Sequence, residues 1–156
     1  MRATMMSGLA TVAAVGKAAR RISDHWPYIH AVSAALAARD IVAEVSVVPA
    51  QLGFCREAVL DLQAEPGAFD QQVPDQAVGF WDETSGWSLT ITRGDRKTEF
   101  FEGTQLVPDP DAVAAWMVVG LTHPGLEAAR GEAWFREAED VDREFEAQLA
   151  RYAPDQ

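Results

Sequence analysis

Hydrophobic residues recur at three- and four-residue intervals in the segment that follows Pro27. The apolar positions here are 28, 29, 32, 35 and 36. Such spacing is typical of a helix with one face turned toward a core. Pro27 suits the first helical turn, because its missing N–H would have no partner there. The pattern predicts a helix over 27–39.

From Ile41 onward the apolar and polar positions alternate, which is typical of β-strands. Polar or glycine-bearing turns separate several such runs, and no helical pattern lies between them. The strand-like runs lie at 41–48, 58–62, 77–81, 87–92 and 97–101. The short turn between the third and fourth runs is typical of an antiparallel hairpin.

Helical spacing returns near the end of the chain in two places. Asp109 and Pro110 form the clearest helix start, because aspartate can cap a helix and proline fits its first turn. This helix should end near Gly120. The second stripe has spacings of four, three, four, four and three, which predicts a long amphipathic helix. Its members are Trp134, Ala138, Val141, Phe145, Leu149 and Tyr152.

Helices at both ends of a continuous run of strands predict the fold class. We expect an α+β fold with an antiparallel sheet of about five strands, helices packed on one face and a long C-terminal helix. A chain of 156 residues has the size of one domain. We divide it into an N-terminal helical extension (1–22), an α+β core domain (23–122) and an acidic amphipathic C-terminal helix (123–156).

The chain is strongly acidic, with a formal net charge of -11. This charge repels phosphate backbones and anionic lipid, so we expect neither nucleic acid nor a membrane as a partner. The charge is unevenly spread: residues 1–39 hold five basic and one acidic side chain, whereas 126–156 hold four basic and nine acidic ones. The two ends should therefore attract each other, or attract another copy.

No familiar catalytic or cofactor-binding signature occurs in the sequence. The single cysteine, Cys55, excludes an internal disulfide and a cysteine-based zinc site, and it favours a cytoplasmic location. No pair among His25, His30 and His123 has the i, i+4 spacing of a helical metal site. A nucleophile elbow, a phosphate loop and a dinucleotide fingerprint are all missing. We expect no metal and no cofactor, and enzymatic activity has no support from motifs.

Two sets of residues are candidates for binding. Trp81 and Trp87 flank one turn, and they could line a groove between sheet and helices with Trp116 and Tyr28, where a flat apolar ligand would stack. Packing in the core is the simpler interpretation of these aromatic residues. The apolar stripe of the last segment needs a cover, which indicates a protein contact. The candidate partner-binding residues are Trp134, Val141, Phe145, Leu149 and Tyr152.

These observations lead to two main functional hypotheses, beside a third in which the acidic last helix mimics phosphate and the protein regulates a DNA-binding protein. The first is a non-catalytic protein-binding or scaffold protein that self-associates through its terminal helices, as a homodimer or with another protein. The alternative is a small enzyme or carrier that binds an apolar metabolite in a pocket between sheet and helices.

Three short motifs together resemble a known family. They are Pro27-Tyr28, Trp81-Asp82 with Gly86-Trp87, and the run Val107-Pro108-Asp109-Pro110. Over about 26–121 the chain is similar to an actinobacterial family of uncharacterised proteins. This resemblance implies an actinobacterial host and a cytoplasmic setting, but no activity. The flanks 1–22 and 124–156 lie outside the similar part.

Overall fold

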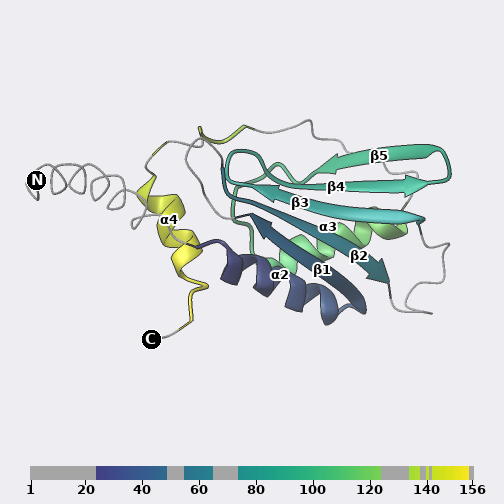
Figure 1. Ribbon diagram of the computed structural model, residues 1–156, viewed down its shortest axis with the longest axis horizontal. Helices are drawn as coiled ribbons and strands as arrows, with labels where there is room; N and C mark the ends of the chain where they lie inside the picture. Colours follow the sequence, from purple (N-terminus) through teal and green to yellow (C-terminus); the bar gives the residue numbers. More distant parts are fainter. Residues whose placement is uncertain are drawn as a thin grey trace, which may run out of the picture.

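The computed structural model describes residues 24–48, 55–64, 74–123, 134–137, 140 and 142–154. Within this part a single five-stranded antiparallel sheet carries helices on it, which confirms the predicted α+β class (Figure 1). The elements are α2 (Trp26–Ala37), β1 (Ile41–Val48), β2 (Glu57–Ala64), β3 (Gln76–Asp82), β4 (Gly86–Arg93), β5 (Arg96–Phe101), α3 (Pro110–Thr122) and α4 (Arg143–Ala150).

The sheet is a meander in which each strand pairs with the next one in the chain. In one row across the sheet Leu60 lies opposite Gly79, which pairs with Leu89, which in turn pairs with Phe100. Alternate residues of a strand point to opposite faces, so this register places the main apolar set on one face. That face holds buried Ala58, Leu60, Leu62, Ala77, Trp81, Trp87, Leu89, Ile91 and Phe100.

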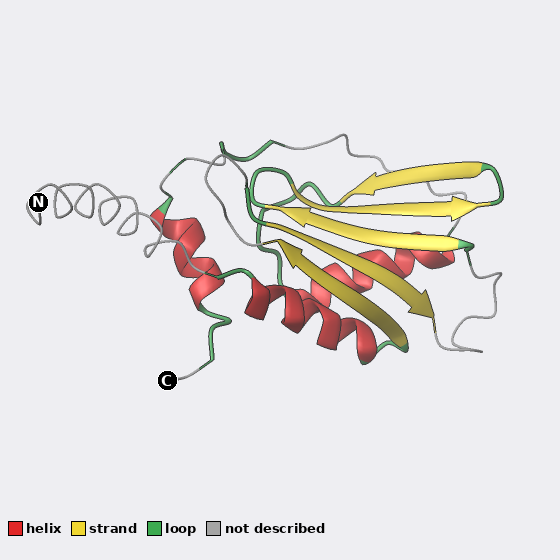
Figure 2. Ribbon diagram, viewed as in Figure 1, coloured by secondary structure: helices red, strands yellow, loops and turns green. Residues whose placement is uncertain are grey.

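Helices α2 and α3 cover this apolar face together, and Figure 2 shows both on the same side of the sheet. Helix α3 packs closely because glycines leave room. A Cβ added at Gly79 would lie 2.8 Å from Cε of Met117, and one added at Gly120 would lie 2.7 Å from Cδ2 of Leu89. These contacts lie well inside van der Waals distance, so a side chain at either position would push the end of Met117 or Leu89 aside.

The predicted helix starts agree with the structure. Helix α2 has Pro27 in its first turn, and α3 begins at Pro110 with Asp109 in the capping position. The side chain of Asp109 makes no capping hydrogen bond, so the cap that we expected from its carboxylate is not formed. None of the helices among the described residues is long and apolar enough to cross a membrane.

The long C-terminal helix predicted within 123–156 is wrong. Helix α4 spans only Arg143–Ala150, and residues 134–137 are not helical. The backbone N–H of Phe135 donates to the carbonyl of Thr84 at 2.8 Å, which ties this segment to the β3–β4 turn. Helix α4 starts where the Asp142 carboxylate accepts a hydrogen bond from the N–H of Phe145. The predicted N-terminal extension, 1–22, lies outside the described residues.

Candidate functional site

The second face of the sheet carries no helix within the described part of the chain. In register across four strands, Val59 lies opposite Phe80, Phe80 opposite Ser88, and Ser88 opposite Phe101. All of these side chains are half-buried. Val59, Phe80 and Phe101 therefore form what we term the apolar row, which crosses the sheet from β2 to β5 with Ser88 within it.

Carboxylates lie on both sides of the apolar row. Glu57 pairs with Asp82 in the register row on one side. The row on the other side holds Glu44 paired with Asp61 and, farther across the sheet, Glu99. Neither of these two acidic rows contains a lysine or an arginine. This face therefore combines an apolar centre with negatively charged margins.

Exposed valines extend the apolar character to the edge of the sheet. Val42 and Val48, on edge strand β1, are 50% and 41% exposed. Both lie an even number of residues from Ser46 on β1, and Ser46 lies opposite Val59. Their side chains therefore point to the same face as the apolar row. The helix-free face is thus more apolar than a solvent-facing surface requires.

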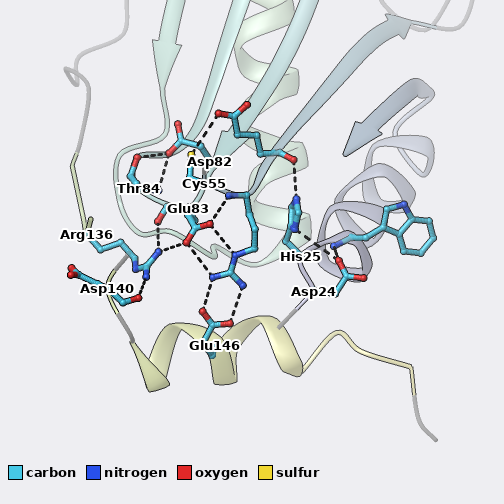
Figure 3. Close-up of polar contacts among 12 residues, drawn as sticks. Asp24, His25, Cys55, Asp82, Glu83, Thr84, Arg136, Asp140 and Glu146 are labelled. Carbon is cyan, nitrogen blue, oxygen red and sulfur yellow. Dashed lines mark hydrogen bonds and ion pairs between the residues drawn. The ribbon is translucent and has the colours of Figure 1, made fainter. Parts of the chain in front are cut away.

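A second feature is a buried cluster of charges at the end of the sheet where the β3–β4 turn lies. Its members, which we term the ion cluster, are Arg56, Glu83, Arg136 and Glu146. Arg56 Nε lies 3.0 Å from Glu83 Oε2, and Arg56 Nη2 lies 2.6 Å from Glu146 Oε2. Arg136 Nη1 donates to Glu83 Oε1 at 2.6 Å. Figure 3 shows Glu83 beside Arg136, with Glu146 reaching toward them from α4.

Two positive and two negative side chains make the ion cluster electrically balanced. Burial by itself would raise the pKa of Glu83, but the hydrogen bonds and charge of Arg56, together with Arg136, outweigh burial and hold this pKa below its ordinary value. The ring of Phe145 lies 5.1 Å from the guanidinium carbon of Arg56 and 4.7 Å from that of Arg136. Glu83 is ionised, and both carboxylates accept hydrogen bonds from arginines, so the ion cluster fastens the C-terminal segment to the sheet.

Two potential acid–base or nucleophilic groups lie near the ion cluster. His25 is buried, stacks on Trp81, and has Nε2 2.8 Å from the carbonyl oxygen of Glu57. Burial lowers the pKa of His25 despite that contact, which keeps the ring neutral at pH 7. Burial and the carboxylates of Asp82 and Glu57 raise the pKa of the Cys55 thiol to about 11. Cys55 is therefore a protonated thiol, a poor nucleophile at neutral pH.

The residues predicted to bind an apolar ligand are mostly interior. Tyr28, Trp81 and Trp87 are completely or almost completely buried. Their polar atoms bond within the protein: Tyr28 Oη donates to the carbonyl of Pro108 at 2.7 Å and accepts from Trp87 Nε1 at 3.0 Å. Trp116 is half-buried at the margin of the same core. The structure thus brings three of the four together as core residues, and a ligand would have to displace them.

The residues predicted to bind a partner are divided between surface and interior. Trp134 is 63% exposed. Phe145 and Leu149 are buried, and Tyr152 packs against Tyr28 with 5.0 Å between the ring centres. Val141 lies outside the described residues. A partner could reach Trp134 directly, whereas the buried members would first have to be uncovered, so partner binding by this segment stays a prediction.

Sequence reasoning missed both features of the site. The apolar row had a signal: Phe80 lies beside Trp81, and Phe101 beside Phe100, so these strands carry large apolar residues on both faces. The ion cluster had no local signal, because Arg56 and Glu83 are 27 positions apart and Arg56 and Glu146 are 90 apart.

Metal-ligating side chains do not gather in groups of three or more among the residues that the structure describes. Comparisons with curated proteins and with solved structures gave no match. A family of unknown function, DUF6292, matches residues 28–118. This range holds all five strands, the apolar row, Arg56 and Glu83, but it ends before Arg136 and Glu146. The match covers more than half of the chain, which therefore belongs to the DUF6292 family.

Proposed function

We propose that this protein is a non-catalytic protein-binding or scaffold protein whose binding surface is the helix-free face of the sheet. The observation that carries the proposal is the apolar row of Val59, Phe80 and Phe101, which lies between two acidic rows. Half-buried aromatic residues on a sheet face lower the free energy when a partner covers them. An apolar centre with a polar rim is the usual composition of a protein interface.

The negative charges of the two acidic rows indicate which kind of partner this face can bind. An anionic partner would be repelled by the two acidic rows, and the net charge of -11 strengthens that repulsion. Two copies meeting face to face would place carboxylates opposite carboxylates. The proposed partner is therefore a protein segment with an apolar centre and lysine or arginine residues at its margins.

In this proposal, self-association through the terminal helices involves only the exposed part of the C-terminal segment. Phe145 and Leu149 of α4 are buried in their own chain, and the ion cluster holds α4 there. A homodimer contact through this segment would use Trp134. The cytoplasmic setting and the actinobacterial host, which the sequence suggested, belong to the proposal as well.

The alternative of a carrier or small enzyme for an apolar metabolite has less support. Tyr28, Trp81 and Trp87 would have to line its pocket, yet they fill the core and bond to one another or to backbone carbonyls. Binding there would need both displaced side chains and broken hydrogen bonds, which together cost several kcal/mol.

Affinity capture with a matched pair of surface variants tests the proposal. Phe80→Ser removes the centre of the apolar row, and Val119→Ser removes an exposed valine, 41% accessible, from helix α3. Each full-length variant serves as bait in a lysate of the native host, after circular dichroism has shown that both are folded. We expect a protein that the wild-type chain and Val119→Ser retain and that Phe80→Ser loses. The proposal is wrong if every captured protein binds the two variants equally.

A further inference from the structure

We propose that a cleft between strand β5 and the C-terminal end of helix α3 binds a small carboxylic acid with a compact apolar body. This inference goes beyond the proposed function, because the cleft lies on the helix-covered side of the sheet, opposite the proposed docking face. We term it the arginine cleft. Its lining residues are Ile91, Arg93, Arg96, Thr98, Phe100 and Gly120.

The strand register brings two arginines together at the end of the β4–β5 hairpin. Arg93 lies directly opposite Arg96, and the next pair on the same face is Ile91 opposite Thr98. Alternate residues of a strand share a face, so both arginine side chains start from the side of the sheet that holds buried Ile91. Like charges directly opposite each other destabilise a strand pair. An anion bound between the two arginines would offset that repulsion.

The end of helix α3 lies over the same end of the sheet. Figure 1 shows α3 running toward the end that carries the β4–β5 turn, and Arg93 Nη2 donates to the carbonyl oxygen of Leu121 at 2.7 Å. Within the described part of the chain, β5 has a strand neighbour on one side only. The arginine cleft is therefore bounded by α3 on one side and by an edge strand on the other.

The inner part of the arginine cleft is apolar, and its mouth is cationic. Ile91 and Phe100 are buried, whereas Arg96 is exposed. None of the six lining residues is acidic. The ion pairs among the described residues do not include Arg96. An acid whose apolar part enters the cleft brings its carboxylate to Arg96, whose planar set of N–H donors matches a carboxylate.

The hydrogen bond between Arg93 and the Leu121 carbonyl gives Arg93 a structural role as well. It satisfies a carbonyl group of the last turn of α3, and it fixes one positive charge at the wall of the cleft. A charge that is already held in place loses little conformational freedom when a ligand arrives. We therefore assign the direct contact with the carboxylate to Arg96 and the fixed positive charge to Arg93.

The size of the arginine cleft limits the ligand. Its volume is about 220 Å³. Sites for drug-sized ligands have roughly 300–1,000 Å³, so this cleft fits a single ring or a short branched chain. A carboxylate suits the protein better than a phosphate ester, because the net charge of -11 opposes a dianion more strongly than a monoanion.

A larger cavity offers the opposite chemistry. Its volume is about 640 Å³, and its lining includes Asp61 and Asp75. Among the described residues that line it there is no lysine and no arginine. An anion would be repelled there, so the charges of the lining residues direct a carboxylic acid to the arginine cleft.

Titration of the full chain with benzoate, followed by NMR of the backbone amides, tests the proposal. Benzyl alcohol keeps the ring without the charge, and acetate keeps the charge without the ring. We expect saturable binding of benzoate that is roughly tenfold or more tighter than either, with the largest shifts at Thr98, Phe100 and Gly120. Binding that does not saturate below about 10 mM, or largest shifts around Asp61 and Asp75, would overturn the proposal. Tighter binding of phenyl phosphate than of benzoate would overturn the assignment to a carboxylic acid.

Two matched variants separate a contact in the cleft from a general effect of charge. Arg96→Gln removes the cation at the mouth, and Lys97→Gln removes the same charge from the next residue, whose side chain points to the opposite face. Arg96→Gln should weaken benzoate binding by roughly tenfold or more, while Lys97→Gln leaves it nearly unchanged. Equal losses in the two variants would contradict a carboxylate contact with Arg96.

A third variant tests the apolar part of the site. Thr98→Leu fills the cleft without a change of charge, so benzoate should bind it roughly tenfold or more weakly than it binds the wild type. Wild-type affinity in this variant would show that the ring does not enter the cleft. Phe80→Ser, on the opposite face, should leave benzoate binding unchanged, so the arginine cleft and the docking face can fail separately.

Discussion

Replacing Glu83 with glutamine should strongly destabilise the fold. The Glu83 carboxylate accepts hydrogen bonds from the backbone N–H, Nε and Nη2 of Arg56 and from Nη1 of Arg136. Glutamine keeps one oxygen acceptor and turns an NH₂ group toward guanidinium donors. It also leaves two buried arginines with Glu146 as the only remaining carboxylate of the ion cluster.

The magnitude follows from the burial of these groups. Glu83 is 3% exposed and Arg56 2% exposed, so water cannot replace the lost partner. Removing one partner of such a buried pair costs about 3–5 kcal/mol, a large part of the roughly 5–15 kcal/mol that stabilises a typical domain. For a chain of this size the melting temperature should fall by roughly 6–20 °C.

Urea denaturation followed by tryptophan fluorescence measures the loss. Asp111→Asn is the matched control, because Asp111 pairs with Arg39 at 3.2 Å on the surface, with its side chain 74% exposed. An exposed pair contributes at most about 1 kcal/mol. If Glu83→Gln costs no more than Asp111→Asn, the ion cluster does not fasten the C-terminal segment to the sheet.

Three further predictions concern single side chains. Tyr28→Phe leaves the Trp87 Nε1–H and the Pro108 carbonyl without their partner, so the free energy of unfolding should fall by about 1–3 kcal/mol in urea titrations. His25 stays neutral in the folded chain, whereas in the unfolded chain it is protonated below its ordinary pKa of 6.5, so the free energy of unfolding should fall as the pH drops below that value, by up to about 1.4 kcal/mol per pH unit. Denaturation at pH 7.5 and at pH 5.5 measures this loss, which should be smaller for His25→Gln. Cys55, with a pKa of about 11, should react with iodoacetamide at pH 8 at least tenfold more slowly in the folded chain than in denaturant, and equal rates would contradict its assigned environment.

The elements with strong local signals were predictable from the sequence. Pro27 and Pro110 marked helix starts that the structure contains, and the alternation in 77–81 and 87–92 marked the β3–β4 hairpin. In each case the residues that decide the structure are neighbours in the chain. Helical spacing, proline geometry and strand alternation act over a few residues, so they can be read directly from the sequence.

The C-terminal segment shows why the remaining structure could not be predicted. Its helical spacing was real, yet Phe135 bonds to Thr84, and Arg136 binds Glu83, both about 50 positions away. These distant contacts compete with helix formation and decide the backbone path. The ion cluster could not be predicted for the same reason, because its members are far apart in the sequence. The apolar row could have been predicted from the sequence, because adjacent large residues such as Phe80 and Trp81 indicate a strand with two apolar faces.

The affinity of a captured partner for the Phe80→Ser and Val119→Ser chains tests the central claim most directly. Calorimetric titration of the purified partner against each folded variant gives the two dissociation constants. A docking surface centred on Phe80 predicts at least tenfold weaker binding for Phe80→Ser, a loss of about 1.4 kcal/mol or more, and wild-type affinity for Val119→Ser. Wild-type affinity for both variants would contradict the claim that the helix-free face is where this protein binds its partner.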